Sequence, residues 1–314
     1  MRVFPAYRYP SIAIKNPQAK NLNLECNRLL KMNTNKTPEL SFEFFPPRTE
    51  KGVENLSQVH AELAKFDPTF FSVTFGAGGS TQDGTYDAVK SMIEAGSDAA
   101  PHISCVGASK DNIRQMIQSY VELGVKRLVV LRGDLPSGMV ELGDFSYASD
   151  LVTFIRQEFG SDLHLEVAAY PDFHPESPNP KQDLGNFKLK VEAGADSALT
   201  QYFYNADSYF AYVDEVRRMG VDVPIIPGIM PITNYATLVR FSDNCGAELP
   251  QWIRSRLAQY QHDEASLKSF GLDVVTHLCL DLLENGVAGL HFYALNKVEP
   301  VNEICKRVGF QRSE

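Results

Sequence analysis

Short apolar runs alternate with longer amphipathic stretches along the chain from residue 39 onward. After the first run, Leu56, Val59, Leu63 and Phe66 recur at the spacing of a helix that buries one face. Runs that are apolar on both faces are typical of parallel strands covered by helices. The pattern therefore predicts eight strands: Leu40–Pro47, Phe70–Gly76, Pro101–Gly107, Arg127–Asp134, His164–Pro171, Ser197–Phe203, Pro224–Pro231 and Gly289–Asn296.

Glycines stand where six of the predicted helices should end. The positions, all just before the next strand, are Gly96, Gly124, Gly160, Gly194, Gly220 and Gly286. Glycine is the preferred residue just past a helix C-terminus because it adopts positive φ without strain. Strands that alternate with helices in this way predict a (β/α)8 TIM barrel, which typically has ~250 residues. A doubly wound open sheet is the alternative.

Residues 37–314 form the predicted catalytic barrel as a single domain, and residues 1–36 are set apart as an N-terminal tail. The tail is basic, with Glu25 as its one acidic residue. It is poor in serine and not clearly amphipathic before Asn21, which speaks against an organelle transit peptide. Two interpretations stay open: a loose tail, or a true start at Met32 that makes residues 1–31 an artefact.

Composition narrows the function classes. The net charge of -9 and the pI of about 5.3 give no basic field for nucleic acid or an anionic membrane. An anionic ligand therefore needs local help from a few cations or helix N-termini. Five scattered cysteines without a CxxC pair favour reduced thiols in a cytoplasmic protein. No apolar run is long enough for a membrane span.

The run Leu40–Arg48, LSFEFFPPR, places one carboxylate in an apolar strand that two prolines end. Strand side chains alternate, so Glu43 lies on the face opposite Phe42 and Phe44. One interpretation is a structural ion pair with a nearby Arg or Lys. The other is a general acid at a pocket mouth, where apolar surroundings raise its pKa towards neutrality. This run alone does not decide between them.

Polar residues gather at the C-terminal ends of the predicted strands, where barrel enzymes carry their chemistry. They are Glu43, Thr74, His102, Asp134, Tyr170, His174, Gln201, Tyr293 and Asn296. A Schiff-base lysine is poorly supported, because the candidate Lys297 lies past the last strand. His102, Asp134 and His174 lack the spacing of metal ligands, so we expect no metal. A dinucleotide fingerprint fails because Thr81 replaces its third glycine.

Two further features bear on ligand binding. Asp134 follows a glycine at a strand end, which is typical of a turn cap, but beside Glu43 it makes a pair of carboxylates that divide acid and charge-stabilising roles. Asp183, Asn186 and Lys190 lie on one face at the start of a predicted helix. That face is either solvated or a grip for a ribose and a phosphate.

Seven motifs in series resemble the methylenetetrahydrofolate reductases, flavoenzymes of one-carbon metabolism. They are SFEFFPPR, VTFGAGGST, LRGD, AAYPDFHPE, TQYFYN, PGIMPITNY and HFYALN, and the resemblance spans residues 39–310. It implies a (β/α)8 barrel that binds FAD, takes a hydride from NADH or NADPH in ping-pong order, and reduces 5,10-methylenetetrahydrofolate to 5-methyltetrahydrofolate.

The resemblance also implies roles for single residues. Glu43 matches a general acid, Asp134 a carboxylate near the flavin and pterin, and Gln201 a pterin contact. Phe241 matches an aromatic that stacks where nicotinamide and folate take turns. The positions that match FAD contacts are Thr74, His102, Arg132, Gly133, Asp134, Tyr147, Ala148, Tyr170, His174, Asp183, Asn186 and Lys190.

The chain departs from the family pattern at Leu189, where relatives carry a second basic residue, and at Thr237 and Lys297, which replace Gln and Arg at folate-contacting positions. A Lys keeps the charge but loses the bidentate fork. We expect a homo-oligomer, and no control by S-adenosylmethionine, because the chain ends just after the last barrel helix. The alternatives are a pterin-binding methyltransferase barrel and a non-catalytic flavin or folate binder.

Overall fold

A computed structural model describes residues 37–75, 82–133 and 143–313. The predicted tail at 1–36, the glycine-rich turn at 76–81 and Asp134 lie outside these ranges.

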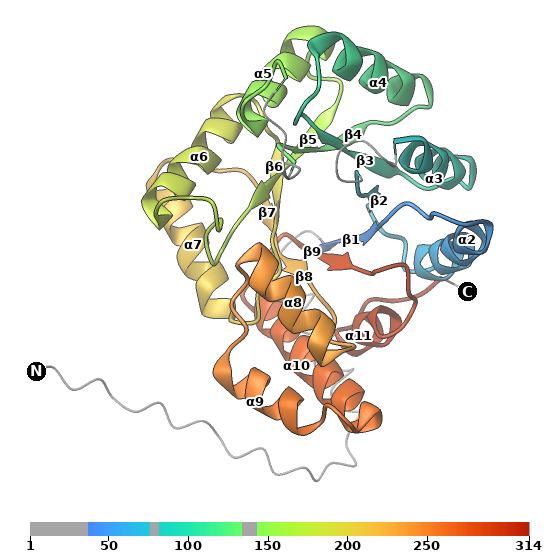
Figure 1. The fold of residues 1–314 in the computed structure, drawn as a ribbon, viewed down its shortest axis with the longest axis vertical. Helices are drawn as coiled ribbons and strands as arrows, with labels where there is room; N and C mark the ends of the chain where they lie inside the picture. The colour runs from blue at the N-terminus through green and yellow to red at the C-terminus, as the bar shows by residue number, and fades with distance from the viewer. Residues whose placement is uncertain (1–36, 76–81, 134–142, 314) are drawn as a thin grey trace, which may run out of the picture.

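Parallel strands form a closed ring in the centre of the described structure (Figure 1). The strands are β1 (Glu39–Phe44), β2 (Phe70–Val73), β3 (Ala99–Ser104), β4 (Arg127–Leu131), β5 (His164–Ala169), β6 (Ser197–Thr200), β7 (Ile225–Ile226), β8 (Gly228–Ile229) and β9 (Gly289–Tyr293). Their order is β7-β6-β5-β4-β3-β2-β1-β9-β8. Because only Pro227 separates the two end strands, the sheet closes with eight strand positions, as the predicted (β/α)8 barrel requires.

Helices surround the ring on its outer side (Figure 1). They are α2 (Glu50–Ala64), α3 (Gln82–Glu94), α4 (Lys110–Glu122), α5 (Ala148–Phe159), α6 (Pro180–Glu192), α7 (Ala206–Arg218), α8 (Tyr235–Cys245), α9 (Gln251–Gln259), α10 (Glu264–Glu284) and α11 (Val301–Arg307). The six glycines predicted at helix ends all have positive φ. Ser109 caps α4, accepting a hydrogen bond from the Asn112 N–H at 3.3 Å.

The seventh predicted strand is interrupted. Proline has no N–H to donate, so Pro227 breaks the ladder into β7 and β8. Its carbonyl still accepts the His291 N–H at 3.0 Å, which keeps both halves against β9. Several predicted strands also end too late; β6 stops at Thr200, before the predicted end at Phe203.

Two apolar layers hold the barrel. Phe42 and Phe44 point outward from β1 into the large layer between strands and helices. A small cluster fills the middle of the ring: Phe70, Ala100, Val129, Leu199 and Ile226. Burying one such large side chain contributes about 1.5–3 kcal/mol. Because the inner cluster is small, polar side chains occupy the interior on both sides of it.

No described helix has the length and apolar character needed to cross a bilayer. The described cysteines, Cys105, Cys245, Cys279 and Cys305, are free thiols. The cytoplasmic location and the homo-oligomer stay predictions.

Candidate active site

Glu43 lies near the C-terminal end of β1 and points into the barrel. Its neighbours Phe42 and Phe44 are buried in the outer layer, so strand alternation fixes the inward direction of the carboxylate. Its side chain is 16% exposed, so the carboxylate is largely buried but not sealed off. The register pairs Glu43 with Ser72 on β2 and with Tyr293 on β9.

Two histidines flank the Glu43 carboxylate. The Nε2 atoms of His102 and His291 lie 3.3 Å and 3.5 Å from Glu43 Oε2. On its other side, His291 Nδ1 lies 2.7 Å from Ser41 Oγ, and both residues are buried. The Nε2 of His102 is buried without a hydrogen-bond partner among the described residues. A buried donor left in this state is costly, so it marks a place where a ligand or water can bind.

The ionisation of Glu43 follows from these neighbours. Burial raises the pKa of its carboxyl, but the charges of His102 and His291 and their close polar contacts with the carboxylate outweigh burial and lower the pKa to about 2. The interpretation in which apolar surroundings raise this pKa is therefore wrong, because the cavity wall supplies imidazoles. The partner expected in the other interpretation, an Arg or Lys, is also absent among the described neighbours. Glu43 is thus ionised at neutral pH in the ligand-free site.

A cavity of about 720 Å³ opens at the ends of β4 and β5 and against α5 and α6. This size falls within the range of small-molecule sites. Nine of the twelve predicted cofactor positions line it: Arg132, Gly133, Tyr147, Ala148, Tyr170, His174, Asp183, Asn186 and Lys190. Ser104, two residues after His102 on the same face of β3, also lines it. The Glu43 pocket therefore lies beside this cavity.

Backbone conformation shapes the cavity at Gly133. Its φ is 88°, and a Cβ there would come 1.9 Å from Ser104 Oγ. Glycine adopts this φ without strain, and any larger residue would also displace the Ser104 side chain. The adjacent Arg132 donates to Glu176 Oε2 at 2.6 Å, so its guanidinium is held at the rim. The LRGD motif thus supplies a close backbone approach and a cation.

Lys190 and Asp183 set the charge at the α6 side of the cavity. Burial lowers the pKa of Lys190 to about 8, against the attraction of Asp183. Burial also raises the pKa of Asp183, whose carboxylate accepts the His174 N–H at 3.2 Å. An anionic group bound beside Lys190 would restore its charge, because an opposite charge favours the ammonium form.

The N-terminus of α5 faces the same cavity, through Tyr147, Ala148 and Ser149. Asp150 accepts the Tyr147 N–H at 2.9 Å, which caps this helix, and the Tyr147 side chain is left 61% exposed. Free N–H groups and the helix dipole make such an end suitable for a phosphate. A diphosphate-bearing cofactor therefore fits the residues present.

The chain matches the methylenetetrahydrofolate reductase family model over residues 28–309. The 5,10-methylenetetrahydrofolate reductase of Escherichia coli K12 is 38% identical over 273 residues, covering 86% of this chain and 90% of that protein. The chain belongs to the methylenetetrahydrofolate reductase family. A plant relative, methylenetetrahydrofolate reductase (NADH) 1 of Arabidopsis thaliana, is 36% identical over 82% of this chain and 46% of its own length.

A solved structure agrees on the fold. An uncharacterized protein from Clostridium thermocellum, described as binding two copies of 5-methyl-5,6,7,8-tetrahydrofolic acid, has a TM-score of 0.61 at 17% identity and covers 91% of this chain and 98% of that one. At this identity the likeness concerns the barrel architecture.

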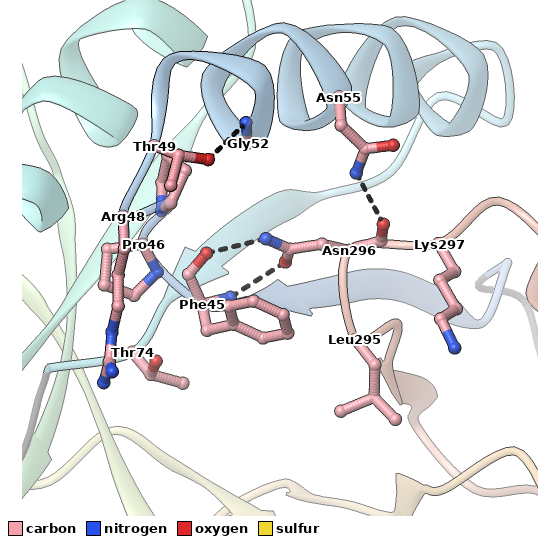
Figure 2. A pocket seen from close by; sticks show the side chains of 11 residues that line it. Phe45, Pro46, Arg48, Thr49, Gly52, Asn55, Thr74, Leu295, Asn296 and Lys297 are labelled. Atoms are coloured by element: carbon pink, nitrogen blue, oxygen red, sulfur yellow. Dashed lines mark hydrogen bonds between the residues drawn. The ribbon is translucent and has the colours of Figure 1, made fainter. Parts of the chain in front are cut away.

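The remaining predicted site residues of this reductase family member are spread around the mouth. Thr74 and Lys297 line a second cavity (Figure 2). Gln201 follows β6, and its Oε1 accepts the Tyr202 N–H at 3.0 Å. Thr237 and the half-buried Phe241 lie one turn apart on one face of α8. No contact described here joins either of them to Glu43, and Asp134 lies outside the described residues.

Sequence reasoning missed Ser41 and His291 as partners of Glu43. The signal was available in strand alternation: Ser41 and Glu43 share one face of β1, and His291 and Tyr293 share one face of β9. Strand alternation alone does not give the register between β1 and β9, which pairs Ser41 with His291. Tyr293 belongs to the same face, and its hydroxyl donates to the Thr200 carbonyl at 2.8 Å.

Proposed function

We propose that this protein reduces 5,10-methylenetetrahydrofolate to 5-methyltetrahydrofolate, with NADH or NADPH as the hydride source and FAD as its cofactor. The observation that carries the proposal is the common location of the Glu43 pocket and the 720 Å³ cavity at one end of the barrel. Membership of the reductase family and the names of the relatives support the substrate. The name of the plant relative supports NADH as donor.

The residues of the larger cavity are suited to FAD. Arg132, Lys190 and the N-terminus of α5 offer positive charge to a diphosphate, and Gly133 allows close approach of a flat ring. Tyr170 and His174, whose rings meet edge to face at 4.6 Å, offer apolar walls. Bound FAD would accept a hydride from the nicotinamide and pass it to the folate, so one site serves both substrates in turn.

Glu43 is assigned to the opening of the folate's five-membered ring. The ring nitrogen that leaves the bridging carbon must gain a proton, and Glu43 is a carboxyl group that points into the barrel near its mouth. Its pKa of about 2 in the ligand-free site means that the proton arrives with substrate binding. Folate covers the pocket and excludes water, which raises a carboxyl pKa. The pair Ser41–His291 provides a hydrogen-bonded connection to the carboxylate.

A spectrum tests the proposal. The purified protein should be yellow with one bound FAD, and anaerobic NADH or NADPH should bleach it. Added 5,10-methylenetetrahydrofolate should then restore the colour. A protein that cannot take up FAD contradicts the proposal, and folate binding without a flavin spectrum would favour a methyltransferase barrel. A flavin that nicotinamide reduces but folate never reoxidises would favour a non-catalytic folate binder.

A further inference from the structure

Two predicted substrate contacts, Gln201 after β6 and Phe241 in α8, are joined through their next neighbours in the chain. Tyr202 comes directly after Gln201. Ser242 comes directly after Phe241. The hydroxyl oxygens of Tyr202 and Ser242 lie 3.2 Å apart, and both residues are buried. This hydroxyl pair therefore connects the end of β6 with the helix that carries Phe241.

The last turn of α8 makes a second contact with the same tyrosine. The Cys245 thiol donates to the Tyr202 oxygen at 3.4 Å. Burial raises the pKa of Tyr202, so its hydroxyl keeps its proton and stays a donor. With the thiol on its oxygen, the Tyr202 O–H is directed to Ser242 Oγ. One phenol thus holds two residues of α8 that lie on neighbouring turns.

Tyr202 is also tied to the barrel mouth. Its N–H donates to Gln201 Oε1 at 3.0 Å, and the Gln201 N–H donates to the Ala169 carbonyl at 2.8 Å. The Tyr202 ring meets the Tyr293 ring edge to face, with centroids 6.2 Å apart. The register of β1 and β9 pairs Tyr293 with Glu43. Tyr202 therefore lies between α8 and the strand that borders the acid.

Packing alone does not account for a pair of hydroxyls at this place. Leu238, one turn before Ser242, is buried on the same helix, and the Tyr204 ring lies 5.9 Å from the Tyr202 ring. Replacing both partners of a buried hydrogen bond by apolar groups of the same shape is nearly neutral for stability. A hydrogen bond differs from an apolar contact because it is directional. The pair therefore adds a defined placement of α8 against β6.

We propose that Tyr202 is a positioning residue for the folate half-reaction, and that it acts by fixing Phe241 relative to Gln201 through its bond to Ser242. The inference rests on the proposed function. Gln201 matches a pterin contact, and Phe241 matches an aromatic that folate and nicotinamide use in turn. The folate would contact both residues at once, and the nicotinamide would contact Phe241 alone. The spacing that Tyr202 sets therefore matters for folate more than for the nicotinamide.

Tyr202→Phe tests the proposal, because it removes the hydroxyl and keeps the ring. In the FAD-loaded protein, the KM for 5,10-methylenetetrahydrofolate should rise about fivefold, the effect of one neutral hydrogen bond. The KM for NADH and the rate at which NADH bleaches the flavin should stay within about twofold of the wild type. A rise of both KM values by the same factor would overturn the inference, as would an unchanged KM for the folate.

A double variant separates positioning from stability. Tyr202→Phe alone leaves the Ser242 hydroxyl buried without this partner, so the melting temperature should fall. Tyr202→Phe/Ser242→Ala removes both hydroxyls and should recover most of that loss, while the KM for the folate stays raised by about the same factor as in the single variant. A double variant that recovers both the melting temperature and the KM would show that the pair acts through stability, and would contradict the proposal.

Tyr209→Phe is the matched control. The Tyr209 hydroxyl donates to the Ile225 carbonyl at 2.7 Å, and Tyr209 is as buried as Tyr202. The variant loses a buried tyrosine hydrogen bond in α7, at a residue that adjoins no predicted substrate contact. It should lower the melting temperature and leave both KM values within about twofold of the wild type. A rise in the folate KM equal to that of Tyr202→Phe would contradict the positioning role.

Calorimetry separates this inference from the proposed function. 5-Methyltetrahydrofolate is titrated without turnover into the wild type, Tyr202→Phe and Tyr209→Phe. Binding that weakens about fivefold in Tyr202→Phe alone, in a protein that never reduces folate, would contradict the proposed function and support the positioning of a folate site. Equal binding by all three proteins, with an unchanged folate KM in an active reductase, would contradict the positioning role alone.

Discussion

Two carboxylates lie inside the same barrel, one near each end. Glu43 occupies the C-terminal side, and Glu166, the third residue of β5, occupies the N-terminal side. Both have a lowered pKa although burial raises it, because bonded and charged neighbours favour the ionised form. Between them lies the small apolar cluster of the barrel interior. The two residues share a chemical type and differ in their surroundings.

Glu166 is fully partnered. Its Oε1 meets the Arg127 guanidinium and lies 3.2 Å from His164 Nε2, and its Oε2 accepts the Ser197 hydroxyl at 2.6 Å. Arg127 also stacks over Phe70, with its Cζ 4.5 Å from the ring centroid. A carboxylate in which every oxygen is bonded and a permanent cation is adjacent has no group left for a ligand. Its location at the N-terminal face is typical of a stabilising residue.

Glu43 has weaker partners. Its neighbours are two imidazoles, both on Oε2, and one of them carries an unsatisfied Nε2. Imidazoles gain and lose protons near neutral pH, whereas a guanidinium does not. The comparison teaches that burial and a lowered pKa do not by themselves mark a catalytic carboxylate. The titratable partners and the open hydrogen-bonding capacity distinguish Glu43.

The largest expected effect is on turnover. Glu43→Gln should lower kcat for folate reduction by at least ~10²-fold, because the amide cannot donate an acidic proton. Thermal stability should change little, since the glutamine still accepts a hydrogen bond from His291 at a partly solvated position. Steady-state kinetics and a melting curve measure both. Turnover at the wild-type rate would remove Glu43 from the mechanism.

The second effect is on stability. Glu166→Gln should lower the free energy of unfolding by about 3 kcal/mol, because it leaves the Arg127 charge partly buried without its partner. Activity per folded molecule should stay within about twofold of the wild type, as the change lies at the opposite end of the barrel. Denaturant titration and kinetics measure these values. The double variant Arg127→Met/Glu166→Gln should recover part of the loss, and its failure to do so would show that the charge is not the cause.

A third prediction concerns the positioning of Glu43. His291→Asn removes one of the two imidazoles that lower its pKa, so the alkaline limb of the kcat–pH profile, on which the general acid loses its proton, should move to higher pH. The maximum rate should fall about tenfold, because the carboxylate loses a partner that orients it. His164→Asn, at the Glu166 end, is the control and should leave the profile unmoved. Equal shifts of the kcat–pH profile in both variants would contradict the proposed difference between Glu43 and Glu166.

The smallest expected effect concerns Lys190, the cation proposed to contact FAD. Lys190 has a pKa lowered to about 8, so it is charged below pH 8 and loses its proton as the pH rises through that value. FAD affinity should therefore weaken above pH 8, by up to about tenfold, because a charge-assisted contact is lost. Lys190→Met should show the weaker affinity at every pH. If FAD affinity had the same pH dependence in the wild type and in Lys190→Met, Lys190 would not be the group responsible for it.

The sequence predicted the barrel for physical reasons. Helix-period and apolar-run patterns are local, so the order of elements and the glycines at helix ends were accessible. The strand-end rule placed Tyr170 and His174 at the mouth, and the family resemblance added Arg132 and Lys190; all four line the larger cavity. Strand ends and the break at Pro227 were less accessible, because ladder hydrogen bonds depend on neighbouring strands.

The partners of Glu43 were not accessible from local patterns. His291 lies 248 positions away in the chain, and its contact depends on ring closure between β1 and β9. The direction of the pKa shift was missed for the same reason. A carboxyl in apolar surroundings and one beside two imidazoles differ only in residues that the fold brings together.

The central claim is that Glu43 serves the folate step, and rapid mixing of Glu43→Gln tests it most directly. The two half-reactions are followed separately under anaerobic conditions by flavin absorbance. The account predicts that NADH bleaches the flavin within about threefold of the wild-type rate, while reoxidation by 5,10-methylenetetrahydrofolate slows by at least ~10²-fold. Equal slowing of both half-reactions, or normal reoxidation, would contradict it.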